Sequence, residues 1–305
     1  MEAKHPKRLA VLFALLAAVC LSSARSPACA QDVFLRAPEF DGPQFDSPAD
    51  FSEADLPETY APDDGEYGDI PGDSPGTVFG PQPQTQTAAP SSSPAAAGGG
   101  YWIVSSRHCG SRHDGRPLNC PLRFYYVSPD RRIHISSREL FAGSMPPGSP
   151  ACVLVHGRFP SWESIVMGSS EVYQWLSPEM SAAPAAVVFF TWPSDKPNTM
   201  MLPLDFAILG RRSEYHGSHL ARFLSMIPPG HPVSLMGHSH GARTVSAALH
   251  LRDGGEVDGV RFGRAPDFDR RVRVVFAAAA IDNDWLNPGQ RFGLALSGTE
   301  YLVNM

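Results

Sequence analysis

The sequence lacks a histidine in its last part, because the final one is His250 and the chain continues to Met305. It is also poor in cysteine, with five among 305 residues. Neither sign of charge dominates strongly, since the net charge is −6 and the pI is about 6.0. This balance gives no indication of a nucleic-acid partner or of binding to an anionic membrane surface.

Residues 1–30 have the composition of a secretory signal peptide. A basic start precedes the apolar run Leu9–Leu21, and the small residues Ala28–Ala30 fit a cleavage site after Ala30. The run is short for an uncleaved membrane anchor, which needs about 20 apolar residues. Lipid attachment at Cys20 is a weaker alternative. We therefore expect an exported protein, with the secreted, periplasmic and cell-envelope compartments left open.

Residues 31–100 have almost nothing to bury. Their first part is acidic and rich in proline and glycine, and their second part is a low-complexity stretch ending in "SSSPAAAGGG". Such compositions cannot bury enough apolar surface to offset the entropy lost on ordering. We expect a disordered linker here.

Three cysteines remain after the predicted cleavage. Cys109 and Cys120 bracket the polar loop "CGSRHDGRPLNC", whereas Cys152 lies in an apolar run and is expected to be a buried thiol. Export favours a disulfide between the first two. A zinc site made with His108 and His113 is the alternative, although the spacing matches no common zinc motif.

From residue 101 to residue 305 the chain reads as one α/β domain. Apolar runs at Ala151–Val155, at Ala185–Trp192 and, interrupted by Arg273, at Val272–Ala280 are typical of buried strands in a sheet that is covered on both faces. An apolar stripe at helical spacing from Leu220 to Ile227 predicts an amphipathic helix between two of them. This alternation predicts a mostly parallel sheet with helices on both faces.

The stretch "VSLMGHSHGARTVSAALH" carries the main chemical signal. Gly237, Ser239 and Gly241 form G-x-S-x-G between a predicted strand and a predicted helix, as in a nucleophile elbow. The structural alternative is an ordinary strand-to-helix turn in which Ser239 caps the helix. If Ser239 is a nucleophile, the oxyanion needs two backbone N–H donors. We expect one donor to be the N–H of His240. The other should come from the loop after the strand "VLV", at Gly157 or Arg158, with Phe159 as a further candidate.

On these residues the chain resembles the α/β-hydrolase superfamily, and within it a poorly characterised bacterial group. The likeness rests on "VHGRF", "FFTWPSD", "GHSHG" and "AAAAIDND", and it covers about residues 101–305. It implies a serine hydrolase acting on an ester, thioester or amide. It also implies that Trp192, Pro193 and Ser194 line the mouth of the site, although a purely structural role for them is an equal alternative.

The catalytic acid and base are harder to place. The family's chain order is serine, acid, histidine. Asp282, ahead of Asp284, is the candidate acid because it follows a predicted strand, but no histidine comes after it. His156, His216, His219, His238 and His240 offer no convincing base. We expect that the domain lacks its last strands, as in a reading frame truncated from a complete hydrolase.

The sequence therefore predicts an impaired serine hydrolase. Ser239 would be the nucleophile, Asp282 the acid, and the N–H groups of His240 and of Gly157 or Arg158 the oxyanion donors. The substrate would be a small-molecule or lipid-like acyl compound, and no metal or organic cofactor is implied. The alternatives are a non-catalytic binding or scaffold protein of the cell envelope that keeps this fold, and an enzyme whose base lies at an unusual position.

Overall fold

The computed structural model describes residues 99–110, 120–182, 184–197, 202–262 and 272–305. The predicted signal peptide (1–30) lies outside the described residues, and so do almost all of the predicted linker and His113. Within the described ranges, no helix combines the length and the apolar character needed to cross a membrane.

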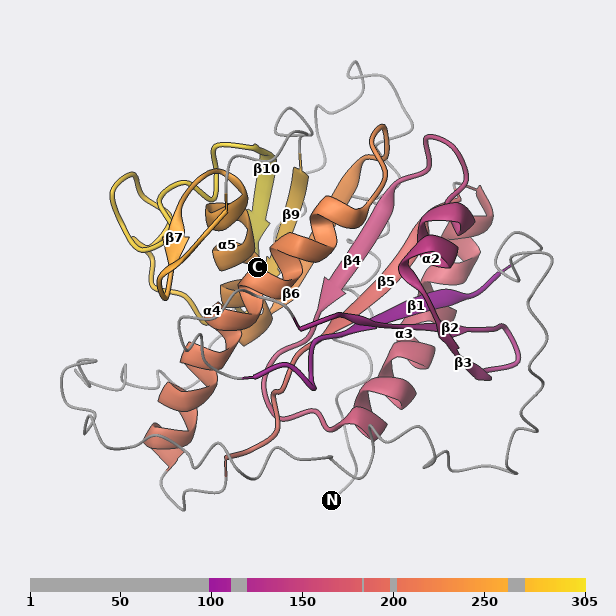
Figure 1. The fold of residues 1–305 in the computed structure, drawn as a ribbon, viewed down its shortest axis with the longest axis horizontal. Coiled ribbons are helices and arrows are strands. Elements are labelled where there is room, and N and C mark those ends of the chain that lie inside the picture. The colour runs from indigo at the N-terminus through magenta and orange to yellow at the C-terminus, as the bar shows by residue number, and fades with distance from the viewer. Residues whose placement is uncertain (1–98, 111–119, 183, 198–201, 263–271) are drawn as a thin grey trace.

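The centre of the structure is an eight-stranded sheet in the order β10-β9-β6-β4-β5-β1-β2-β3 (Figure 1). β2 runs antiparallel to β1 and β3, and every other neighbouring pair is parallel. The predicted class, a mostly parallel α/β sheet, is thus confirmed. The strands are β1 (Tyr101–Ser105), β2 (Arg123–Val127), β3 (Ile133–Ser136), β4 (Ala151–Val155), β5 (Ala186–Thr191), β6 (Val233–His238), β9 (Val272–Ala277) and β10 (Thr299–Asn304).

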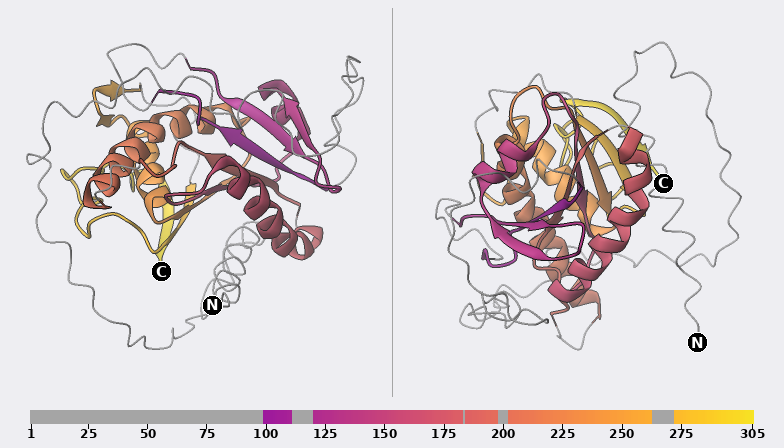
Figure 2. Two further views of the ribbon diagram at one scale, coloured as in Figure 1. Left: turned by 90° about the horizontal axis from the view of Figure 1, so that it is seen from below. Right: turned by 90° about the vertical axis from the view of Figure 1, so that its right-hand side faces the viewer.

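Four helices cover the two faces of the sheet, as both views in Figure 2 show. α3 (Trp162–Ala182) packs on one face, and α2 (Arg138–Ser144), α4 (Leu202–Met226) and α5 (His240–Arg252) pack on the other. The central strands are mostly apolar because alternate side chains enter the two cores. In β4, for example, Val153 joins the core under α4 and α5, and Leu154 joins the core under α3. A small hairpin of β7 (Glu256–Val257) and β8 (Val260–Arg261) follows α5.

The last residues of the chain form a strand that the sequence analysis did not predict, whereas the expectation that further strands are missing stays a prediction. β10 pairs in parallel with β9, with Leu302 opposite Val274 and Asn304 opposite Phe276. Met305 extends the pairing, because its N–H donates to Phe276 O. The segment was missed because its side chains are mostly exposed or half-buried, which leaves no apolar run to detect.

The predicted strand Val272–Ala280 is also too long, since β9 ends at Ala277. The next residue, Ala278, has φ 45°, a left-handed backbone conformation that an extended strand does not contain. The chain therefore turns out of the sheet there and reaches the loop that carries Asp282.

Candidate active site

Ser239 occupies a sharp turn between β6 and α5. Its backbone has φ 52° and ψ −121°, outside the helical and extended regions, and α5 begins at the next residue. Non-glycine residues held in such conformations are rare and cost about 1–3 kcal/mol each, and they gather at functional sites. The predicted strand–turn–helix context of the motif is therefore present.

The two glycines of the motif allow β6, α5 and β4 to approach closely. A Cβ added at Gly237 would lie 2.5 Å from Ala242 Cα, and one at Gly241 would lie 2.3 Å from Val155 O. Both obstacles are backbone atoms, which cannot rotate away. Glycine is thus required at both positions for the serine to stand where it does.

The Ser239 side chain does not cap α5, although Ser239 is the N-cap residue. Its backbone is fixed instead by neighbours: its N–H donates to Ala277 O at 2.9 Å, and its carbonyl accepts from Ala242 N and Ala280 N. Serine at an N-cap normally uses its hydroxyl to bond a helix N–H. The structural alternative, a helix-capping serine, is therefore wrong, and the half-buried hydroxyl is left for other chemistry.

The loop after β4 lies against this turn. A Cβ at Gly157 would be 3.0 Å from Ser239 Cβ, so the backbone of Gly157 passes directly beside the serine. The N–H of Phe159 donates to Ser194 O at 2.7 Å and is not available to a substrate. Among the described residues, no acceptor is found for the N–H of Arg158 or of Gly157. These two residues remain the candidates for the second oxyanion donor.

The first of the two expected hydrogen-bond donors to the oxyanion is the backbone N–H of His240. This residue opens α5, and the first N–H groups of a helix have no acceptor within it. The positive end of the helix dipole adds to the attraction of an anion at this point. The structure thus brings the amides of Gly157, Arg158 and His240 to the same sheet edge as Ser239.

His156 holds the loop and is not a base for Ser239. Its Nδ1 donates to Gly157 O at 2.7 Å, which leaves Nε2 to accept from Thr191 Oγ1 at 2.9 Å. Its ring stacks on Trp192, whose Nε1 donates to His156 O. Burial lowers the pKa of His156 to about 3, so the ring is neutral near pH 7.

The Trp192-Pro193-Ser194 segment has the structural role that the sequence left as an alternative. All three residues are buried. Ser194 Oγ donates to Pro160 O at 3.1 Å, and Ser194 O accepts from Phe159 N. The segment therefore supports the loop from behind and does not line the mouth of the site.

Arg107 is a buried clamp that the sequence analysis missed. Arg107 lies in the segment after β1, and its side chain is 1% exposed and forms an ion pair with Asp195. Its Nη1 also donates to Trp192 O at 3.0 Å and to Pro160 O at 3.3 Å. A single guanidinium thus ties the ends of both supporting loops together. Nothing in the sequence around Arg107 distinguishes it from the other arginines of the chain.

Aromatic side chains line one side of the turn. The Arg158 guanidinium lies 3.5 Å from the centroid of the Phe206 ring and 4.9 Å from that of Phe159. Phe206, on α4, stacks in turn on His240. Burial, together with the charges of Arg243 and Arg158, lowers the pKa of His240 to about 4. This part of the site is therefore apolar and electropositive.

The predicted acid, Asp282, lies on the loop after β9 with an exposed side chain, as does Asp284. Ala280 of this loop donates its N–H to Ser239 O, so the loop touches the turn. Neither carboxylate bonds a histidine among the described residues. The role of Asp282 stays a prediction, and the structure gives it no imidazole to orient.

None of the other histidines supplies a base for the serine. His216 and His219 are fully buried within α4, where His216 Nδ1 lies 2.9 Å from Ser106 Oγ. His240 is buried and its ring stacks on Phe206. His238 is exposed and flanks the turn. Within the described part of the chain, no histidine nitrogen makes a hydrogen bond to Ser239 Oγ.

A buried ion-pair network connects the loop after β9, which carries Asp282, to α4 and α5. The sequence analysis did not predict it. Glu214 on α4 pairs with Arg291 at 2.7 Å and with Arg243 at 3.4 Å. Both guanidinium groups lie over the ring of Trp285, and Arg243 Nε also donates to Ala280 O. Burial raises the pKa of Glu214 above its ordinary value, against the effect of the two arginines. The network fixes the loop that contacts Ser239.

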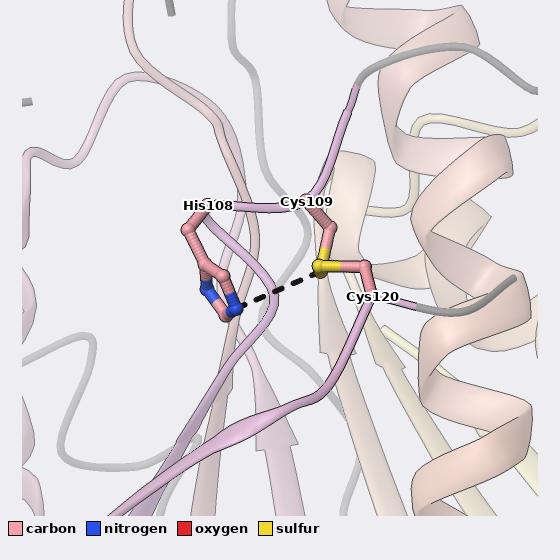
Figure 3. A group of neighbouring side chains, drawn as sticks. All are labelled: His108, Cys109 and Cys120. Carbon is pink, nitrogen blue, oxygen red and sulfur yellow. Dashed lines mark hydrogen bonds between the residues drawn. A yellow bond between two sulfur atoms is a disulfide. The ribbon is translucent and has the colours of Figure 1, made fainter. Parts of the chain in front are cut away.

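The predicted disulfide is present between Cys109 and Cys120 (Figure 3). His108 lies beside it, with Nε2 4.0 Å from Cys109 Sγ, and these three residues group their potential ligand atoms within 4.8 Å. Both sulfur atoms are used by the disulfide, so the zinc alternative does not hold for this oxidised form. Cys152 is a buried free thiol, as expected.

Comparisons of the chain with protein-family models, with curated proteins and with solved structures gave no match. The function is therefore argued from the site alone.

Proposed function

We propose that residues 101–305 form a serine hydrolase-like domain that cleaves acyl esters, and by extension thioesters or amides, through an acyl-Ser239 intermediate. The observation that carries the proposal is the Ser239 turn, whose strained backbone holds a hydroxyl that caps nothing. The nearby amides of His240 and Arg158 add support, because they suit a developing oxyanion.

In the proposed reaction, Ser239 Oγ bonds to the carbonyl carbon and the carbonyl electron pair moves to oxygen. The resulting oxyanion accepts hydrogen bonds from the N–H groups of His240 and of Arg158, with Gly157 as the alternative second donor. Collapse expels the alcohol, which takes up a proton, while the serine proton passes to solvent. Water then attacks the acyl carbon and releases the acid and free Ser239.

The missing base limits the expected rate. No histidine bonds Ser239 among the described residues, so nothing there accepts its proton at the moment of attack. Oxyanion stabilisation and binding alone retain about 10³–10⁴-fold acceleration over water in serine hydrolases stripped of their triad. We therefore expect slow turnover and preferential reaction with activated esters.

The second candidate is a binding or scaffold protein that keeps the fold without catalysis. The same absence of a base for Ser239 favours it. In that case the turn would serve as an anion or carbonyl binding site, and no covalent adduct would form.

The two candidates are separated by labelling the full-length protein with a fluorophosphonate, which reacts with activated serines. We expect one adduct, located on Ser239 by peptide mass spectrometry and lost in Ser239→Ala. Ser164→Ala, which changes an exposed serine on α3, should label like the wild type. A folded protein that does not label at all would leave the binding candidate.

We also propose that the protein is exported. The Cys109–Cys120 disulfide supports this, because disulfides persist in oxidising compartments. The test is the N-terminal sequence of the protein recovered outside the cytoplasm, which should begin at Gln31. Recovery of the protein only from the cytoplasm with Met1 in place would contradict export.

A further inference from the structure

The position of the Arg158 side chain suggests a substrate preference for the proposed acyl-transfer site. Arg158 belongs to the loop that passes beside Ser239, and its neighbour Gly157 is close enough that a Cβ there would lie 3.0 Å from Ser239 Cβ. The guanidinium is stacked on Phe206, which itself stacks on the residue after the nucleophile. The positive charge of Arg158 is thus held beside the Ser239 turn.

This guanidinium pairs with no carboxylate among the described residues. The nearby Asp195 is engaged by Arg107, and the buried Glu214 is engaged by Arg243 and Arg291. Asp282 follows β9, on the side of β6 away from β4 and its loop. By contrast, each of the other arginines that support the site, at positions 107, 243 and 291, has an acidic partner.

The environment of the Arg158 guanidinium is also electropositive and partly shielded from solvent. Partial burial lowers the pKa of Arg158, and its charge helps to lower that of His240. The rings of Phe206 and Phe159 hold the guanidinium in place, and Arg158 stays half-exposed, so a ligand can reach its N–H groups. Arginine in such a setting suits bidentate binding of a carboxylate or phosphate.

We infer that the Ser239 site takes acyl esters whose acyl part carries a negative charge, and that Arg158 binds this charge. The inference rests on the proposed function, because it assumes that Ser239 is acylated. Arg158 would then contribute twice, through its backbone N–H to the oxyanion and through its side chain to selection of the acyl group.

The experiment compares three activated esters of similar size on the full-length protein. They are the mono-4-nitrophenyl ester of terephthalic acid, 4-nitrophenyl 4-methylbenzoate and 4-nitrophenyl 4-(aminomethyl)benzoate, which are anionic, neutral and cationic and whose para substituents cannot attack their own ester group. The readouts are the rate of nitrophenolate release in the acylation phase and the acyl mass on Ser239. We expect the anionic ester to acylate about tenfold faster than the neutral one, and the cationic ester to be slowest, since charged hydrogen bonds are the stronger ones.

The decisive quantity is the anionic-to-neutral rate ratio in each variant. Arg158→Gln should reduce it to about one, and Arg158→Lys should keep part of it. Arg211→Gln, which removes an exposed cation of α4, should leave the ratio unchanged. If Arg158→Gln does not fold, the wild-type ratio still tests the inference, because added salt should shrink it.

The outcomes separate this inference from the proposed function. Acylation of Ser239 at equal rates by all three esters, or a ratio that survives Arg158→Gln, overturns the charge preference and leaves the hydrolase proposal standing. No acyl mass on Ser239 with any ester overturns both.

Discussion

The packing of Gly241 gives the sharpest test of the Ser239 turn. An alanine Cβ at this position would lie 2.3 Å from Val155 O and 2.6 Å from His156 O. Ordinary van der Waals contact begins near 3.4 Å, so α5 and β4 must separate by about 1 Å. Overpacking of a rigid core costs about 1–3 kcal/mol or more. Because both obstacles are backbone atoms, we expect Gly241→Ala to lower the free energy of unfolding by about 3 kcal/mol.

The matched control is Gly168→Ala in the interior of α3. A Cβ there meets nothing within 4 Å, and helix propensity predicts a gain of about 0.5–1 kcal/mol. Unfolding in urea, followed by tryptophan fluorescence, measures both variants. For a domain of about 200 residues, Gly241→Ala should lower Tm by roughly 6–12 °C. A Gly241→Ala protein as stable as the wild type would show that α5 and β4 do not approach this closely and would refute the packing of the turn derived from these contacts.

Two further predictions concern buried charge. Burial lowers the pKa of His219 to about 3 and that of His216 well below 6.5. Below pH 6.5 the unfolded state therefore binds more protons than the folded state. The free energy of unfolding should fall as pH drops from about 6.5 toward 3, by up to about 1.4 kcal/mol per pH unit for each ring. Urea unfolding at pH 7, 6 and 5 measures the slope, which His219→Gln should reduce; an unchanged slope would contradict the burial of this ring. Arg107→Ala should cost about 2–4 kcal/mol, since it removes the arginine donor to the buried Trp192 carbonyl, one of the two donors to Pro160 O and the ion-pair partner of Asp195, and it should slow labelling of Ser239. Arg107→Lys should restore part of both, and normal labelling of Arg107→Ala would show that the clamp does not position the loop.

The parts of the fold that the sequence predicted are those with strong local signals. β4 is apolar throughout, and β5 and β9 are apolar except at Thr191 and Arg273, because both faces of each strand are covered. The turn at Ser239 was predictable for a similar reason: its two glycines and its flanking strand and helix lie within one short stretch. Local pattern and local structure agree at these points.

The parts that escaped prediction depend on distant partners. β10 is a strand because β9 offers its edge, and "TEYLVN" is too short and too polar to predict a buried strand by itself. Arg107 is a clamp because carbonyls from two other loops converge on it, and Glu214 is buried because two arginines arrive from α5 and from the C-terminal segment. A single polar residue in a sequence carries no sign of which remote groups will surround it.

The energetic cost of the Ser239 turn is the strongest argument that it serves chemistry. A left-handed φ at a residue with a side chain costs about 1–2 kcal/mol, and an unused N-cap hydroxyl forgoes about 1 kcal/mol more. Asparagine or glycine would make the same turn at lower cost, because both tolerate a positive φ. Phe159 and Ala278, which flank the turn on either side, also have positive φ. Of the five such non-glycine residues in the described chain, three therefore lie in the Ser239 turn and in the two loops that contact it. Ser239 makes no side-chain capping bond that would offset this strain, and the proposed role in presenting the hydroxyl to a substrate would account for it.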